Sequence, residues 1–108
     1  MSALRYVVLH HTEIDQPHYD LMFERPSHDR LTTVRCSAWP PAEGAIFEPI
    51  ADHRAAYLDY EGPISGNRGR VTRVESGTCI IDADGSDSLL LSLSSGRKIR
   101  IPTTGFEK

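Results

Sequence analysis

Apolar, β-branched and aromatic residues alternate with polar ones in short stretches along most of this chain. A period of two residues over a few positions indicates a β-strand that buries one of its faces. We find no long stretch with the 3.6-residue period of a helix. The predicted strands are residues 5–11, 18–24, 31–36, 45–50, 69–74, 78–81, 89–93 and 98–101.

Gly, Pro, Asp and Ser residues separate these stretches and predict the turns between them. We expect a turn at Ser76 and Gly77, hairpin turns at residues 84–85 and 94–96, and one helical turn at residues 54–58. Many short strands at near-regular spacing predict an all-β, mainly antiparallel fold, with residues 1–108 as a single domain. We expect a small closed or nearly closed β-barrel with at most one short helical turn, and a β-sandwich is the alternative.

The composition, with 39% hydrophobic and 25% charged residues, is that of a soluble globular protein. The chain has neither an apolar run long enough for a transmembrane helix nor the features of a signal peptide at its start, so we expect a cytoplasmic protein without a membrane partner. Cys36 and Cys79 have no zinc-finger spacing and are predicted to be reduced and half-buried.

The formal net charge of −3 argues against a protein that holds nucleic acid by bulk electrostatics. It remains compatible with a protein that docks a phosphate through a metal ion and a few arginines. The composition therefore limits the kind of nucleic-acid contact to expect and does not exclude one.

His11, His18 and Asp20 form the first candidate site. His18 and Asp20 are two residues apart on a predicted strand and so point to the same face, and a hairpin would bring His11 next to His18. Two imidazoles and a carboxylate on one face are a common ligand set for manganese, zinc or iron. The alternative is that the three residues are ordinary strand and loop residues. His10 neighbours His11 and points to the opposite face, so only one of them can join the cluster.

Two further groups of residues suggest phosphate chemistry. His53 and Tyr57 lie four residues apart, and together they offer a proton donor or acceptor near neutral pH and a hydroxyl donor. Residues 66–70 form a glycine-bearing loop in which Arg68 and Arg70 could bind a phosphate. A surface His-Tyr pair and a solvated hairpin loop are the alternative interpretations.

Taken in order, these segments resemble the 3'-phosphoesterase domain family of bacterial DNA ligase D. Residues 6–11 resemble the opening strand of the family, which ends in a metal-binding histidine, and residues 18–20 resemble its His-Tyr-Asp segment. The resemblance covers roughly residues 5–80. Its later parts are His53 with Tyr57, residues 60–63, and residues 66–74.

The resemblance implies a β-barrel, a manganese-type divalent metal with zinc as the alternative, and the removal of a 3'-ribonucleotide or a 3'-phosphate from a DNA end. It implies that His11, His18 and Asp20 hold the metal, that His53 contacts the phosphate and that Tyr57 completes the pocket. We assign His53 and Tyr57 as the catalytic residues. We assign the phosphate contacts to His18, His53, Arg68 and Arg70.

One departure from the family concerns the phosphate site. Met22 stands where the family has an arginine that grips the phosphate, and methionine offers neither a charge nor a donor. Arg35, Arg68 and Arg70 are candidates to replace it. We also expect this protein to lack the extended segment that precedes the first strand in the family.

Three hypotheses follow for the function. The first is a metal-dependent phosphoesterase that processes 3' ends of DNA or RNA in DNA repair. The second is a catalytically weak or inactive module that binds metal and phosphate and acts with separately encoded ligase or end-joining proteins. The third is a small β-barrel interaction protein whose histidines have no ligand.

Overall fold

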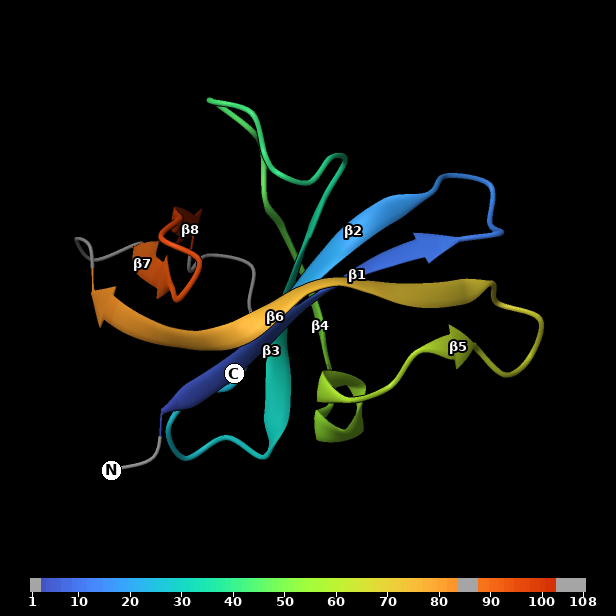
Figure 1. Cartoon of the computed structure of the whole chain (residues 1–108), viewed down its shortest axis with the longest axis horizontal. Helices are drawn as coiled ribbons and strands as arrows, with labels where there is room; N and C mark the ends of the chain where they lie inside the picture. Colours follow the sequence, from blue (N-terminus) through green and yellow to red (C-terminus); the bar gives the residue numbers. More distant parts are fainter. Residues whose placement is uncertain (1–2, 84–87, 103–108) are drawn as a thin grey trace.

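The alternating stretches form eight strands and one short 3-10 helix in this computed structural model, which describes residues 3–83 and 88–102. Figure 1 shows their arrangement. The elements are β1 (Leu4–Thr12), β2 (His18–Phe23), β3 (Arg30–Cys36), β4 (Glu48–Arg54), η1 (Ala55–Leu58), β5 (Gly62–Pro63), β6 (Arg70–Ala83), β7 (Ser88–Leu93) and β8 (Lys98–Pro102).

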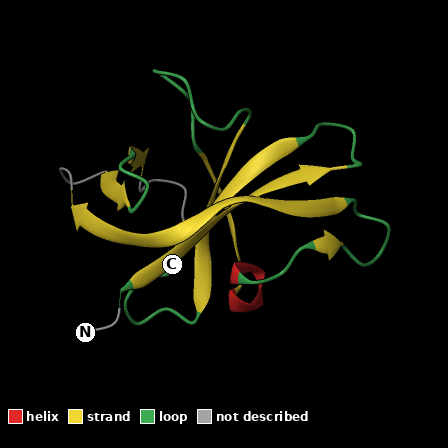
Figure 2. Ribbon diagram, in the orientation of Figure 1, coloured by secondary structure: helices red, strands yellow, loops and turns green. Residues whose placement is uncertain are grey.

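The strands form one antiparallel sheet in the order β4-β3-β2-β1-β6-β7-β8, with the short β5 paired to β6. The sheet curls strongly into a half-barrel, and η1 is the only helical element among the described residues (Figure 2). The predicted all-β antiparallel fold with at most one helical turn is therefore confirmed. Within residues 3–83 and 88–102 no pairing joins β4 to β8, so the barrel stays open along that edge.

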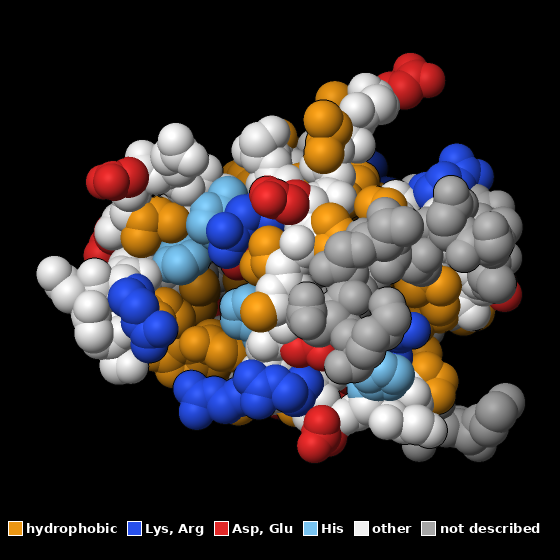
Figure 3. Space-filling model, turned by 180° about the vertical axis from the view of Figure 1, so that it is seen from behind, with side chains coloured by type: hydrophobic (Ala, Val, Ile, Leu, Met, Phe, Trp, Pro, Cys, Tyr) orange, Lys and Arg blue, Asp and Glu red, His pale blue; other side chains and the backbone are white. Residues whose placement is uncertain are grey.

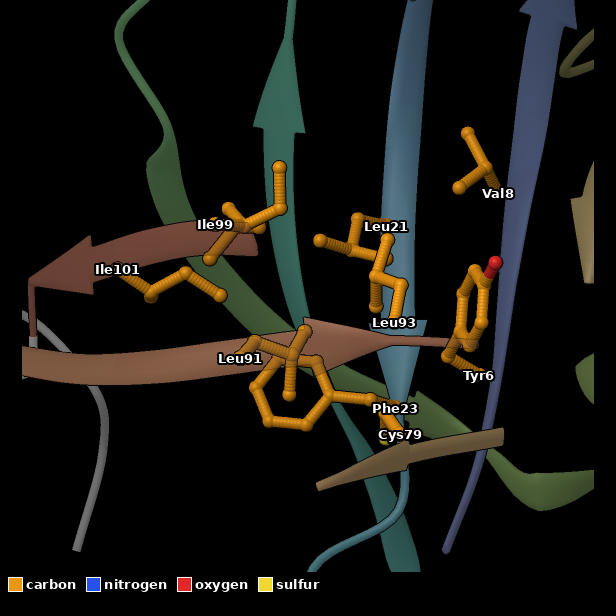
Figure 4. Packing of buried hydrophobic residues seen from close by; sticks show 10 residues of the cluster. Tyr6, Val8, Leu21, Phe23, Cys79, Leu91, Leu93, Ile99 and Ile101 are labelled. Atoms are coloured by element: carbon orange, nitrogen blue, oxygen red, sulfur yellow. The ribbon is translucent and has the colours of Figure 1, made fainter. Parts of the chain in front are cut away.

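Both faces of the central strands are buried, which explains why β1 reads as a continuous apolar run. Tyr6 and Val8 point into the curled sheet, where side chains from β1, β2, β7 and β8 meet (Figure 4). Val7 and Leu9 point to the opposite face and pack with Leu58 of η1 in a second core. The cluster of His11, His18 and Asp20 lies on this second face.

The predicted turn at Ser76 and Gly77 is wrong, because β6 continues through both residues. A Cβ at Gly77 would collide with the Ser94 hydroxyl and lie 3.3 Å from the ring of Tyr6. The glycine therefore permits a close approach of neighbouring chains and does not mark a turn. The pairing of β1 with β6 also shifts register beside Leu9, which is typical of a β-bulge in a long bent strand.

The predicted strand at residues 45–50 is placed too early, since β4 begins at Glu48 and continues to Arg54. Its pairing with β3 extends to Arg54, although the apolar pattern ends at Ile50. The hairpin turn at residues 94–96 is confirmed by a 2.8 Å hydrogen bond from the Leu93 amide to the Arg97 carbonyl. The predicted turn at residues 84–85 lies outside the described residues.

Cys36 and Cys79 are buried and unpaired, more enclosed than the half-buried positions expected for them. Burial raises the pKa of the Cys36 thiol, and it raises that of Cys79 to about 11. Both thiols therefore remain protonated near neutral pH. No helix in the part of the chain that the structure describes is long and apolar enough to cross a membrane.

Candidate metal centre

The register of β1 and β2 places His11 directly opposite His18, with Asp20 two residues further along β2. The two imidazole centroids are 5.0 Å apart, and one ligand atom from each of the three residues lies within 4.8 Å of the other two. His10 points to the other face, where it stacks on Tyr19 with ring centroids 4.2 Å apart. Strand alternation thus selects His11 over His10 for this cluster.

A backbone carbonyl sets the tautomer of His18. Its Nδ1 lies 2.9 Å from the carbonyl oxygen of Gln16, and because that oxygen can only accept, Nδ1 carries the proton. The other nitrogen, Nε2, then holds a lone pair. This atom is buried, has no hydrogen-bond partner in the described structure, and lies 3.4 Å from Oδ2 of Asp20.

A lone pair facing a carboxylate oxygen in a buried place is unfavourable unless a cation lies between them. A proton on Nε2 or a divalent metal ion would satisfy both atoms. The donor set of two imidazoles and one carboxylate is one that manganese, zinc and iron accept, so the residues present fit a bound metal.

A second backbone carbonyl orients His11. Its Nε2 donates to the carbonyl of Arg68 at 2.8 Å, which leaves Nδ1 as the free lone pair. Metal-binding histidines usually have their other nitrogen held in this way, because the bond fixes the ring and raises its basicity. Both imidazoles of the cluster therefore have the supporting contacts of metal ligands.

Gly69 makes the contact between His11 and Arg68 possible. Its φ of +86° lies in the left-handed region, and a Cβ there would collide with the Thr12 carbonyl and come within 3.1 Å of His11 Nε2. Any larger residue would push the loop away from β1. The glycine-bearing loop thus supports the candidate metal centre through its backbone.

Arg35 of β3 lies beside the cluster, directly opposite Asp20 in the β2–β3 pairing. Its Nε donates to Oδ1 of Asp20 at 3.0 Å, while Asp20 itself is only 2% exposed. Arg35 and His18 both line an open hollow of about 970 Å³. Arg35 is therefore the arginine that the structure places at the cluster, a position that the sequence alone could not assign.

The other arginines named as phosphate ligands point elsewhere. Arg68 folds back on its own loop and donates from Nε to the Ser65 carbonyl at 2.7 Å, and Arg70 pairs with Glu13 at 3.4 Å. Met22 is buried in the second core, so its position offers no opening for a phosphate. The contribution of Arg68 to the cluster is its carbonyl group.

His53 and Tyr57 contact each other, and His53 lies near enough to the cluster for the charge of Asp20 to act on it. Their rings meet edge to face with centroids 5.6 Å apart, and His53 Nδ1 lies 3.0 Å from the Ala51 carbonyl and 3.1 Å from the Thr33 hydroxyl. Burial lowers the pKa of His53 below its ordinary 6.5, and the negative charge of Asp20 opposes this shift only in part. His53 is therefore neutral near pH 7.

This lowered pKa predicts a pH dependence of folding. Because the unfolded chain takes up a proton at His53 more readily, the stability from this residue is present above pH 6.5 and is lost as the pH falls through its folded pKa. We expect unfolding free energies to decline more steeply with acid in the wild type than in His53→Gln, by at most about 1.4 kcal/mol per pH unit. Denaturant titrations of both proteins from about pH 7.5 to about pH 5 measure this.

The exposed His28 provides a histidine-to-glutamine control for the substitution itself. Parallel slopes for His53→Gln and the wild type would show that His53 titrates alike in the folded and unfolded chain.

From behind, histidine and arginine side chains gather on one face beside apolar side chains (Figure 3). No protein-family model and no curated protein matches the chain. The function is therefore inferred from this arrangement of side chains and from the sequence segments described above.

Proposed function

We propose that the protein is a metal-dependent phosphoesterase that acts on 3'-phosphate or 3'-ribonucleotide ends of DNA or RNA in DNA repair. The observation that carries this proposal is the buried, unpartnered Nε2 of His18, 3.4 Å from Asp20 Oδ2 and close to His11. The class of reaction comes from the donor set and the neighbouring arginine. The 3'-end substrate comes from the resemblance to the phosphoesterase domain of DNA ligase D.

His11, His18 and Asp20 would hold the metal, manganese or alternatively zinc. A divalent metal in such a site polarises a phosphoryl oxygen and lowers the pKa of bound water. Arg35 is fixed by Asp20 through Nε, and the remainder of its guanidinium group can donate to a phosphate in the adjoining hollow.

His53 and Tyr57 supply the remaining chemistry. His53 is neutral at pH 7, so it can accept a proton from an attacking water and return it to the leaving oxygen. The Tyr57 hydroxyl can donate a hydrogen bond that orients the phosphate.

The test is turnover by the purified protein on DNA strands that end in a 3'-phosphate or a 3'-ribonucleotide, and on a simple phosphodiester. We expect turnover that requires added Mn²⁺ or Zn²⁺ and is lost in Asp20→Asn, which removes one ligand charge. Asp52→Asn, at an exposed position, should retain it. Absence of turnover on every substrate by the metal-loaded protein would overturn the enzyme proposal.

The buried position of Met22 favours a second candidate function. Because the arginine position of the family is part of the core here, the protein could bind metal and 3' ends without cleaving them, as a partner of separately encoded ligase or end-joining proteins. Binding of 3'-blocked DNA ends by the metal-loaded protein without turnover would support this function.

Arg35 provides a prediction that separates catalysis from metal binding. Arg35→Lys keeps a positive charge beside Asp20 but loses the planar fork, so we expect turnover at saturating metal to fall by about hundredfold. Metal affinity should fall by about tenfold or less, since it depends on Arg35 only through Asp20. Steady-state kinetics and metal titration measure the two effects.

Arg30→Lys is the matched control on the same strand, because the Arg30 guanidinium donates to the Asp52 carbonyl, at 3.5 Å, and not to Asp20. We expect it to keep wild-type turnover. Equal losses in the two variants would exclude a specific contact between Arg35 and the substrate.

A further inference from the structure

A second hollow of about 410 Å³ opens beside η1. Its volume is within the range of small-molecule sites, roughly 300–1,000 Å³. Two of its lining residues also belong to the centre described above. Arg68 holds His11 through its carbonyl, and Tyr57 contacts the ring of His53. Arg68 and Tyr57 therefore connect this hollow to the residues of the candidate site.

Tyr60 presents a fixed aromatic ring in the hollow. Its hydroxyl donates to the Pro63 carbonyl, and its ring meets the Tyr57 ring at 89° with centroids 5.9 Å apart. Tyr57 packs against the second core, whereas Tyr60 belongs to neither core cluster of the described residues and is 37% exposed. Core packing thus accounts for Tyr57 but leaves the ring of Tyr60 available to a ligand.

The charged groups around the hollow favour an anionic ligand. Arg54 and Arg68 both line it. The acid that lines it, Asp59, is engaged by the guanidinium of Arg5 at 2.8 Å, and this hydrogen bond lowers the pKa of Asp59. Two tyrosine rings beside two arginines offer stacking surfaces and anion contacts together, which is the combination that binds nucleotides.

We propose that this hollow binds the nucleobase of the 3'-terminal nucleotide whose phosphate lies at the metal centre, with Tyr60 as the stacking surface. The proposal rests on the proposed function for the place of the phosphate. It adds that the substrate is recognised as a nucleotide and not as a bare phosphate ester. Since every base has a flat π face that can stack on Tyr60, the hollow would bind any of the four bases.

The experiment compares two ligands that differ only in the base, adenosine 3'-monophosphate and ribose 3-phosphate, bound to the metal-free protein and followed by NMR. Without metal, hydrolysis does not interfere, and the outcome is independent of the metal proposal. We expect the wild type to bind adenosine 3'-monophosphate about tenfold more tightly, with shifts in the ring signals of Tyr57 and Tyr60. Tyr60→Leu should bind both ligands alike, whereas Tyr60→Phe should keep most of the preference.

Each outcome tests base binding separately from the phosphoesterase proposal. Equal binding of the two ligands by the wild type, or a preference that survives Tyr60→Leu, would overturn the base-binding proposal and leave the phosphoesterase proposal intact. A preference that disappears in Tyr60→Leu supports base binding even if the protein shows no metal-dependent turnover. The wild-type comparison and the ring signals keep the test decisive if Tyr60→Leu does not fold.

Discussion

His18→Ala is expected to lower the affinity of the protein for Mn²⁺ or Zn²⁺ by more than about hundredfold, beyond the effect usual for supporting residues of a metal site. The variant removes the buried Nε2 that faces Asp20 and leaves His11 and Asp20 without their common neighbour. Isothermal titration calorimetry gives the affinity for each metal. NMR gives the residues that respond, by paramagnetic broadening with manganese and by chemical shift with zinc.

His28→Ala is a closely matched control for this prediction. His28 Nδ1 lies 2.9 Å from the Pro26 carbonyl, the same local bond that His18 makes to Gln16, but His28 is exposed and outside the cluster. Metal affinity should therefore be unchanged in this variant. If both variants bind metal as the wild type does, the three residues are not a metal centre, and Nε2 of His18 is satisfied by a proton alone.

The arrangement of the candidate ligands could be predicted from sequence because it depends on local geometry. His18 and Asp20 share a face by strand alternation, and a short hairpin brings His11 opposite His18. The same alternation separates His10 from the cluster. The all-β fold follows from equally local signals, since each strand carries its own apolar pattern and turn residues.

The supporting contacts could not be predicted, because they join residues far apart in the chain. Arg35 reaches Asp20 only in the β2–β3 register that the structure shows, and the Arg68 carbonyl reaches His11 across 57 residues. The turn predicted at Gly77 is wrong for the same reason, since the role of this glycine depends on its approach to Ser94 and Tyr6. In the sequence, a glycine in such a place looks like a turn residue. What requires it is the close packing of residues far apart in the chain.

Gly69→Ala is expected to destabilise the protein and to weaken metal binding at the same time. Alanine at a φ of +86° is strained by about 1–3 kcal/mol, and its Cβ would collide with the Thr12 carbonyl. Thr12 pairs with Arg70 in the β1–β6 ladder and cannot move away easily. The loop would shift instead and break the bond from His11 to the Arg68 carbonyl, so we expect metal affinity to fall by about 10–100-fold.

Gly66→Ala separates the strain of the backbone from the collision. Gly66 lies in the same loop with a φ of +77°, but the nearest atom to an added Cβ is Nε of the Arg68 side chain at 3.4 Å. This variant should lose a similar strain energy in denaturant unfolding and keep the metal affinity of the wild type in calorimetry. If Gly66→Ala weakens metal binding as much as Gly69→Ala, loop strain alone is responsible. If neither variant does, the carbonyl of Arg68 has no part in orienting His11.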